Sequence, residues 1–363
     1  MIYRAIGVMS GSSMDGLDIA FIELTETGGK WSYEILAASC LAYDSQWIQK
    51  LTAAQQMSAM EYFFLHAEYG KYIGTKINDF IETNDLQHRV NLVCSHGHTV
   101  FHFPAQKFTA QLGDGAAIAA QIKLPVVSDL RSIDIAFGGQ GAPIVPIGEK
   151  LLFGEYTYLL NLGGIANITI NSVGSYKAFD ICAANKILNS LVSLAGLPYD
   201  DEGKLAKKGT INDAVLQQLN GLDYYQLPSP KALDNSFGSN YVLPIIEGAK
   251  LSMEDALATY VEHIVQQIKA AILSHSTPVE NAKILVTGGG AFNTFLIERL
   301  SAVLLPELLT VEVPDATLIQ FKEALIMALI GVLRWREEIN VFASVTGASQ
   351  NNIGGALWLG TEA

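Results

Sequence analysis

Four segments of the chain combine glycine with hydroxyl, carboxylate or amide side chains where a β-type run ends. The first, GSSMDGLD, runs from Gly11 to Asp18 between two such runs. Glycine lets a ligand approach the backbone closely, and successive N–H groups form a nest for anions. Asp15 or Asp18 could hold Mg²⁺ through water, as phosphate-bound magnesium usually is held. The segment predicts a phosphate loop, with an ordinary hairpin turn as the alternative.

Two further glycine turns could contact the same ligand. Gly163 and Gly164 lie in LNLGGIAN, and Gly288 to Gly290 lie in VTGGGAFN. Three bare backbone units after a strand would let a flat nucleoside lie against them. Neither segment has the GxxxxGK[ST] or GxGxxG spacing, so a plain turn is the alternative at both. Because one chain contains both GSSMDGLD and LNLGGIAN, the sequence favours a site in which these two loops bind one polyphosphate.

A carboxylate follows a further predicted strand. In AFDICAAN, Asp180 comes shortly before a helix expected to start near Lys186. A helix N-terminus favours anions, and a carboxylate beside it could act as a general base on a hydroxyl or a water. The alternative is a structural aspartate that joins strand to helix.

Histidines and an arginine form another candidate site. In CSHGHTVFH, His96 and His98 share one face of a predicted strand, and with Asp129 or Asp134 they could bind a metal. Lining of a sugar pocket and a buried polar cluster are the other interpretations. Arg131 could clamp a carboxylate, or simply pair with a surface aspartate. Glu323 precedes a very apolar helix, for which it could equally be a cap.

Composition limits the classes of protein to consider. The 363 residues exceed what one hydrophobic core usually holds, so two lobes are expected. With 50% hydrophobic and 16% charged residues, the chain is not disordered. The net charge of −13, without a Lys/Arg run, argues against nucleic-acid and anionic-membrane partners. Three scattered cysteines and no signal-peptide pattern indicate a reduced, cytoplasmic protein.

Strand and helix patterns alternate along the chain, which predicts an α/β fold with mixed sheets. A short similarity between residues 7–16 and 159–167 indicates a duplicated lobe. The lobes are expected at 1–130, with or without the C-terminal tail, and at 131–363. The longest apolar run, Ala324 to Leu333, is too short for a membrane span of ~20 residues and predicts a buried helix. The predicted strands are 6–9, 19–22, 90–95, 125–128, 158–160, 168–170 and 283–287, and the predicted helices are 61–81, 186–195 and 257–273.

Taken together and in order, the motifs resemble the anhydro-N-acetylmuramic acid kinase family. The matching stretches include GVMSGSSMDGLDIAF, CSHGHTVFH, VVSDLRSIDIAFGGQGAPIVP, LNLGGIANITI, FDICAAN, LVTGGGAFN and FKEALIMALIG. The resemblance implies a two-lobed, actin-like ATPase fold of the sugar-kinase type, with mixed five-stranded-type sheets flanked by helices and an interlobe cleft. It further implies ATP and Mg²⁺, and a homodimer. The implied reaction converts 1,6-anhydro-N-acetylmuramate to N-acetylmuramate 6-phosphate in peptidoglycan recycling.

The resemblance also implies roles for individual residues. Asp180 becomes the catalytic base, and His96, Arg131 and Glu323 become sugar-pocket candidates. The implied ATP and phosphate ligands are Gly11, Ser12, Ser13, Met14, Asp15, Gly16, Leu17, Asp18, Gly163, Gly164, Asn185, Gly288, Gly289 and Gly290.

Two departures from the family pattern bear on activity. The usual Gly-Pro-Gly before Asn185 reads Cys182-Ala183-Ala184, and Ile133 stands where a basic residue is often found. Two other functions therefore stay open. One is a nucleotide-binding protein without kinase activity, and the other is a metal-dependent hydrolase that uses His96, His98 and Asp129.

Overall fold

The computed structural model describes residues 1–11, 14–172, 175–228, 231–234, 236–274 and 282–360. The chain forms two compact units: Met1–Phe153 with Phe321–Ala363 make unit 1, and Gly154–Gln320 make unit 2. The division therefore falls at 153/154 and 320/321, whereas the sequence analysis expected it at 130/131. The chain stays in unit 1 beyond residue 130 because buried Asp134 accepts hydrogen bonds from Thr346 and Asn352 of the C-terminal segment.

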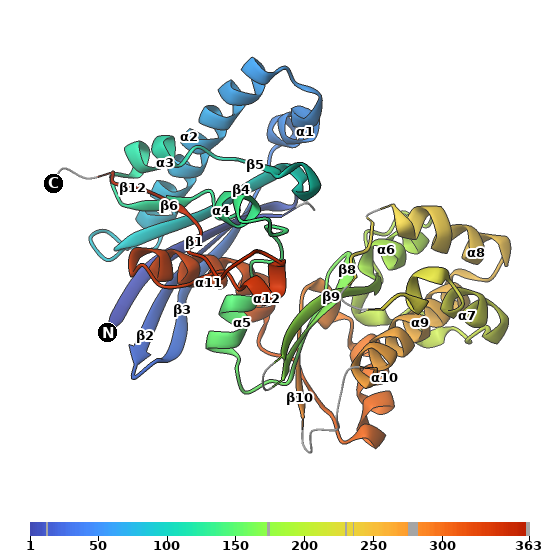
Figure 1. Ribbon diagram of the computed structural model, residues 1–363. Coiled ribbons are helices and arrows are strands. Elements are labelled where there is room, and N and C mark those ends of the chain that lie inside the picture. The colour runs from blue at the N-terminus through green and yellow to red at the C-terminus, as the bar shows by residue number, and fades with distance from the viewer. Residues whose placement is uncertain (12–13, 173–174, 229–230, 235, 275–281, 361–363) are drawn as a thin grey trace. The chain divides into compact units, whose positions relative to one another are not determined.

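Unit 1 is built on a mixed sheet with the strand order β12-β6-β4-β1-β2-β3, and β5 pairs with β4 (Figure 1). β2 is antiparallel to both of its neighbours, β1 and β3. β1, β4 and β6 run parallel to one another, and β12 is antiparallel to β6. The strands are β1 (Ile2–Ser10), β2 (Gly16–Thr27), β3 (Lys30–Ala42), β4 (Leu92–Phe103), β5 (Phe108–Leu112), β6 (Val126–Ser128) and β12 (Ala356–Trp358).

Helices cover this sheet. A capping box between Ser58 and Glu61 starts α2, and Asp44 caps α1. α2 packs closely on α3, since a Cβ on Gly70 would lie 2.6 Å from the carbonyl oxygen of Asp114. The helices wholly within unit 1 are α1 (Ser45–Ala53), α2 (Ala59–Thr83), α3 (Gly115–Ile122), α4 (Ser132–Ala136), α5 (Pro146–Leu152) and α12 (Ala343–Thr346).

The apolar run 324–333 lies in α11 (Ala316–Trp335), and every residue of the run is buried, as the sequence predicts. By length and composition α11 could cross a membrane, but 78% of its most apolar window is buried in the protein, which is typical of a core helix. The helix crosses β1 at Gly7, where a Cβ would lie 1.8 Å from the carbonyl oxygen of Ala324. Only glycine permits this close approach.

Unit 2 repeats the same topology in the strand order β11-β10-β7-β8-β9. Its β7, β8 and β9 are antiparallel like β1, β2 and β3, and β10 and β11 run parallel to β7 like β4 and β6 beside β1. The expected mixed α/β class is therefore confirmed, with a sheet and flanking helices in each unit. The sheet of unit 2 has the expected five strands, whereas that of unit 1 has seven because β5 and β12 join it. The strands are β7 (Tyr158–Leu162), β8 (Ile165–Ser172), β9 (Ser175–Ala183), β10 (Lys283–Thr287) and β11 (Thr310–Glu312).

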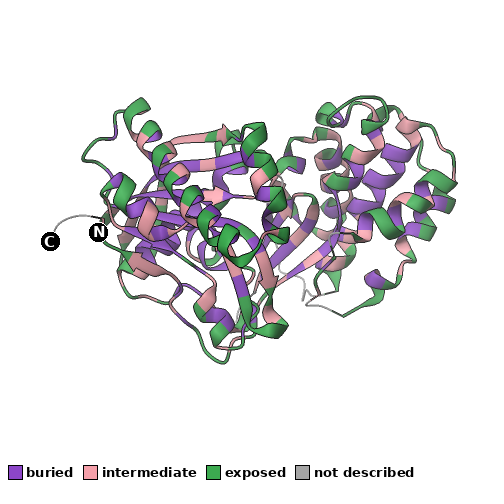
Figure 2. Cartoon of the chain, turned by 90° about the horizontal axis from the view of Figure 1, so that it is seen from above, coloured by how far each residue is buried: buried purple, intermediate pink, exposed green. Residues whose placement is uncertain are grey.

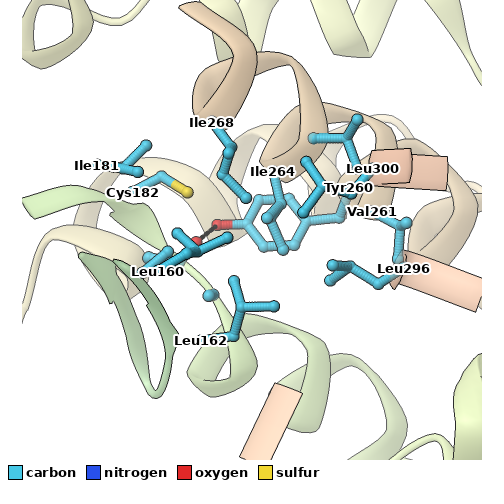
Figure 3. Close-up of a cluster of buried hydrophobic side chains, with 14 of the residues drawn as sticks. Leu160, Leu162, Ile181, Cys182, Tyr260, Val261, Ile264, Ile268, Leu296 and Leu300 are labelled. Carbon is cyan, nitrogen blue, oxygen red and sulfur yellow. Dashed lines mark hydrogen bonds between the residues drawn. The ribbon is translucent and has the colours of Figure 1, made fainter. Parts of the chain in front are cut away.

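The core of unit 2 forms where the sheet meets α9. Tyr260 of α9 is fully buried among Ile264, Leu296 and Leu162, and its hydroxyl donates to the carbonyl oxygen of Ala183 at 2.8 Å (Figure 3). In both units the strands are mostly buried and the outer faces of the helices are exposed (Figure 2). The helices of unit 2 are α6 (Asn185–Ser193), α7 (Asp213–Asn220), α8 (Leu243–Gly248), α9 (Met253–Leu273) and α10 (Thr294–Leu304).

Candidate active site

The predicted phosphate loop is the turn of the β1–β2 hairpin. Ser10 and Leu17 pair across the hairpin, and Met14 in the turn has a φ of +58°. Gly16 is closely packed, since a Cβ on this residue would lie 2.7 Å from the carbonyl oxygen of Leu41. Ser12 and Ser13 lie outside the described residues. The Leu17 side chain is fully buried in the core of unit 1, so only its backbone is available to a phosphate.

A buried hydrogen-bond chain holds the start of this loop. Ser10 Oγ lies 2.9 Å from His98 Nδ1, and the Tyr43 hydroxyl donates to Ser10 Oγ at 2.8 Å. The Tyr43 hydroxyl also lies 2.5 Å from that of Tyr69. Burial raises the pKa of Tyr43 to about 12 and lowers the pKa of His98, so both groups are neutral. His98 therefore acts as a structural partner of the loop.

Two carboxylates flank the loop. Asp15 is exposed in the turn, and Asp18 is partly buried on β2 opposite Cys40 of β3. Burial raises the pKa of Asp18, a hydrogen bond with Cys40 lowers it, and the charge of Asp15 raises it further. Carboxylate oxygens are suitable ligands for Mg²⁺, which often keeps several waters. This pair therefore fits a magnesium ion held through water.

In unit 2, both glycine turns meet the start of α6. The N–H of Asn185 donates to the carbonyl oxygen of Gly163 at 3.1 Å, and the N–H of Ala184 donates to that of Gly164 at 2.8 Å. Asn185 Nδ2 donates to the carbonyl oxygen of Leu162 at 2.9 Å. The structure thus brings together the turn after β7 and the predicted ligand Asn185.

The second turn, Gly288 to Gly290, lies against the same residues. Gly288 has a φ of +80°, which favours glycine. A Cβ on Gly290 would lie 2.7 Å from Leu162 Cβ and 2.9 Å from Asn185 Oδ1. A Cβ on Gly289 would find Asn185 Nδ2 at 3.7 Å. Bare backbone is therefore required at Gly290, and both turns lie against Asn185.

Asp180 lies on β9, next to a bulge in the β8–β9 ladder. It pairs with Asn167 of β8, while Ala166 pairs with Cys182, which leaves Ile181 as the extra residue. Bulges re-aim side chains and are common next to active sites. Asp180 is partly buried, and the structure thus presents its carboxylate at an irregular point of the sheet.

One oxygen of this carboxylate is held by a neighbouring segment. Asp180 Oδ2 accepts from the N–H of Leu233 at 2.9 Å, while its backbone bonds to Lys231 and to the Tyr224 hydroxyl. Burial raises the pKa of Asp180, and the Leu233 N–H partly offsets that rise. A carboxylate with a raised pKa, fixed by one hydrogen bond, is suited to general-base chemistry.

The segment that replaces Gly-Pro-Gly contains one residue with unusual backbone angles. Cys182, Ala183 and Ala184 are buried, and none has a positive φ. Ala184 has φ −129° and ψ −105°, which lies outside the α and β regions. The structure gives no account of the absent basic residue at Ile133, which is exposed on α4.

Arg131 and His96, which the sequence analysis selected separately, are in contact. Arg131 Nε donates to His96 Nε2 at 3.0 Å, and Arg131 Nη1 donates to the carbonyl oxygen of Gly141 at 2.5 Å. The other ring nitrogen of His96, Nδ1, lies 2.9 Å from the carbonyl oxygen of Gly97, to which it donates. Burial, reinforced by Arg131, lowers the pKa of His96 to about 3, so the ring is neutral.

These contacts bear on two of the alternatives. Both nitrogens of His96 are occupied, and no group of three or more His, Cys, Asp or Glu side chains among the described residues could hold a metal ion. The histidine–aspartate metal centre is therefore not found in that part of the chain. Arg131 also forms no ion pair with any described residue, so the simple surface-pair interpretation was wrong.

Glu323 is exposed near the point where α11 approaches β1. The residue before it, Lys322, is buried and forms an ion pair with buried Glu149 at 2.9 Å. The close crossing at Gly7 fixes the same turn of the helix. Glu323 is therefore held on a rigid element and is available to a ligand, rather than serving as a helix cap.

The sequence analysis missed three supporting residues. Tyr43 and Tyr69 hold Ser10, and Asn161 Oδ1 lies 2.5 Å from the Cβ position of Gly288. The tyrosines lie in ordinary helix or loop patterns that carry no signal for this role. Asn161 stands inside the LNLGGIAN motif and could have been selected as a polar residue beside a glycine turn.

Comparison with known proteins agrees with the motif order. The family described as "Anhydro-N-acetylmuramic acid kinase" matches residues 3–360. Curated relatives with that same description include a protein of Methylobacterium nodulans, 34% identical over 97% of this chain and 98% of its own length. Another, from Synechococcus elongatus, is 33% identical over 95% of this chain and 97% of its own length.

Proposed function

Since the chain belongs to the anhydro-N-acetylmuramic acid kinase family, we propose that it catalyses the hydrolytic phosphorylation of 1,6-anhydro-N-acetylmuramic acid. The products are N-acetylmuramate 6-phosphate and ADP, formed during peptidoglycan recycling. The observation that carries the proposal is the family match over residues 3–360, joined to an Asp180 carboxylate fixed at a bulge. The kinase function is favoured over nucleotide binding alone, and over a metal-dependent hydrolase.

In the proposed reaction, Asp180 accepts a proton from a water molecule. That water attacks the anomeric carbon, and the bond between this carbon and O6 breaks. The freed O6 takes the γ-phosphoryl group of ATP, and ADP leaves. A largely dissociative phosphoryl transfer depends on positioning and charge stabilisation more than on covalent help. The hydrogen bond from Leu233 supports this role because it holds Asp180 in one orientation.

The nucleotide ligands are proposed in both units. In unit 2, Gly163, Gly164, Asn185 and the turn at Gly288 to Gly290 provide backbone and amide groups. In unit 1, the turn from Gly11 to Asp18 provides N–H donors for phosphate. Asp15 or Asp18 would hold Mg²⁺ through water, and the ion would neutralise phosphate charge when bound.

The sugar ligands are proposed in unit 1. Arg131 keeps a positive charge, since its surroundings lower its pKa only to about 10, and it suits the carboxylate of the substrate. Neutral His96 orients Arg131, and exposed Glu323 can accept hydrogen bonds from hydroxyl groups.

We further propose that the protein works as a cytoplasmic homodimer. The three cysteines, Cys40, Cys94 and Cys182, are all free, which agrees with a reducing compartment. The homodimer rests on the family resemblance alone.

The function is tested by incubating the protein with ATP, Mg²⁺ and a panel of anhydro and ordinary amino sugars, with products identified by mass. We expect a 6-phosphate product and ADP only with the 1,6-anhydro sugar. In water enriched in oxygen-18, one heavy oxygen should appear at the anomeric carbon. ADP release without any sugar phosphate would contradict the proposal, and ATP binding without turnover would favour the nucleotide-binding alternative.

A further inference from the structure

Asp134 is a buried carboxylate that the proposed reaction does not use. It lies on α4 and is only 1% exposed. Among the described residues, no Lys, Arg or His side chain forms an ion pair with it. A buried charge without a cation must be held by hydrogen bonds, because its burial would otherwise destabilise the fold. The partners of Asp134 therefore show what this carboxylate holds in place.

Neutral donors from two distant segments meet at this carboxylate. Asp134 Oδ1 accepts from Thr346 Oγ1 at 2.8 Å and from Asn352 Nδ2 at 2.9 Å, and both of these residues are buried. Asp134 Oδ2 accepts from the N–H of Gly141 at 2.8 Å. Hydrogen bonds to an ionised acceptor are stronger than those between neutral groups. Asp134 therefore joins the loop at residues 138–141 firmly to the C-terminal segment.

The loop at residues 138–141 is closely fitted to Asp134. A Cβ on Gly139 would lie 2.2 Å from Asp134 Oδ2, so glycine is needed at this position. Gly141 has a φ of +65°, which also favours glycine. The N–H of Gln140 donates to the backbone oxygen of Thr346 at 2.8 Å. The loop is therefore held from two sides, by Asp134 and by the C-terminal segment.

The same loop holds the guanidinium group of Arg131. Gly141, whose N–H donates to Asp134, accepts a hydrogen bond from Arg131 Nη1 at its carbonyl oxygen. Arg131 Nε donates to His96 Nε2 at 3.0 Å. No described residue accepts a hydrogen bond from Arg131 Nη2, so this amino group is left for a ligand. Because an arginine binds a carboxylate through a planar, directional contact, the angle at which the guanidinium is held determines how well it binds one.

We propose that Asp134 is a positioning residue for Arg131: by holding the Gly141 peptide, it fixes the guanidinium in the orientation that binds the carboxylate of the substrate. The inference rests on the proposed function, in which Arg131 binds that carboxylate. It goes beyond that function because it assigns the preference for a carboxylated anhydro sugar to a buried residue that acts through another. The alternative is a purely structural role, in which Asp134 only holds the C-terminal segment.

The test compares the binding of two sugars to the full chain by calorimetry. 1,6-Anhydro-N-acetylmuramate carries the carboxylate, and 1,6-anhydro-N-acetylglucosamine lacks it. In Asp134→Asn, the amide orientation that keeps both bonds at Oδ1 places an NH2 group against the N–H of Gly141, so the bond that fixes the loop is lost. We expect the Kd of the carboxylated sugar to rise about tenfold, the effect of weakening one charge-assisted hydrogen bond. The Kd of the other sugar should stay nearly unchanged.

Three further variants separate positioning from a purely structural role. Thr346→Val is the matched control, because it removes a hydrogen bond to the same carboxylate but leaves the bond to Gly141; it should lower stability and keep the ratio of the two Kd values. Arg131→Ala should abolish the preference for the carboxylated sugar, and adding Asp134→Asn to it should have little further effect. Gly139→Ala displaces the Asp134 carboxylate from a neighbouring position and should reproduce the effect of Asp134→Asn, which keeps the proposal testable if that variant does not fold.

Binding is measured at a temperature at which thermal unfolding shows each variant to be folded. Equal weakening of both sugars in Asp134→Asn would overturn the proposal, and so would a preference for the carboxylated sugar that survives in Arg131→Ala. Product formation is measured separately in the parent protein. Selective binding without any sugar phosphate would contradict the proposed function alone, whereas sugar phosphate formation with an unchanged preference in Asp134→Asn would contradict this inference alone.

Discussion

Replacing Asp180 by Asn removes the proposed proton acceptor with little other change. The side-chain oxygen of Asn can still accept the hydrogen bond that Leu233 N–H donates to Asp180 Oδ2 at 2.9 Å. The backbone bonds to Lys231 and Tyr224 do not involve the side chain. The variant should therefore keep the orientation of the side chain and lose only its basicity.

The expected loss of turnover is about 10²–10⁴-fold, the usual contribution of a general base. The KM for ATP should change little, because Asp180 is not among the proposed nucleotide ligands. Stability should not fall. Burial raises the pKa of Asp180 in the folded state. Its contribution to stability is therefore greatest below the unfolded pKa and is lost as pH rises through the folded pKa. At neutral pH, Asn avoids the free-energy cost of the partly buried charge.

The assay measures ADP and sugar phosphate together, from about pH 4 to pH 9, with thermal unfolding of each variant. The parent should lose activity in acid as the Asp180 carboxyl is protonated, with its midpoint above the ordinary pKa of 3.8. Asp213→Asn, on an exposed position of α7, serves as the matched control and should behave like the parent. Turnover by Asp180→Asn within tenfold of the parent would refute the assignment of this residue as the base.

Three further predictions test the surrounding structure. Gly7→Ala should lower the free energy of unfolding by about 1–3 kcal/mol or more, because its Cβ would overlap a carbonyl oxygen of α11, whereas Gly248→Ala should be tolerated; denaturant unfolding checks both. Lys322→Met should lower it by about 3–5 kcal/mol because the buried Glu149 carboxylate loses the ammonium group that forms an ion pair with it, and adding Glu149→Leu should restore much of the loss. Asn185→Ala should raise the KM for ATP about tenfold with a smaller effect on kcat, measured by steady-state kinetics; an unchanged KM would contradict its placement beside the nucleotide.

Local patterns in the sequence identified much of the fold and of the site. Apolar spacing predicted the helix at residues 61–81, and α2 spans Ala59–Thr83. Strand-ending glycine turns marked the β1–β2 hairpin, the turn after β7 and the turn after β10. These signals are available in sequence because each depends on residues close together in the chain. The motif order also identified the family, which the comparisons confirmed.

Contacts between distant segments could not be obtained in this way. The contact between His96 and Arg131 joins residues 35 positions apart, and the chain from Tyr43 through Ser10 to His98 spans 88 positions. The unit boundary moved because the C-terminal segment packs with the N-terminal unit, which no local pattern reveals.

The sequence by itself determined which residue types were available for chemistry and which strands and helices would carry them, because propensity and periodicity act over a few residues. Only the tertiary structure decided the protonation state of His96, the partner of Asp180 and the pairing of Lys322 with Glu149. Those depend on desolvation and on hydrogen bonds between segments that meet only when the chain has folded.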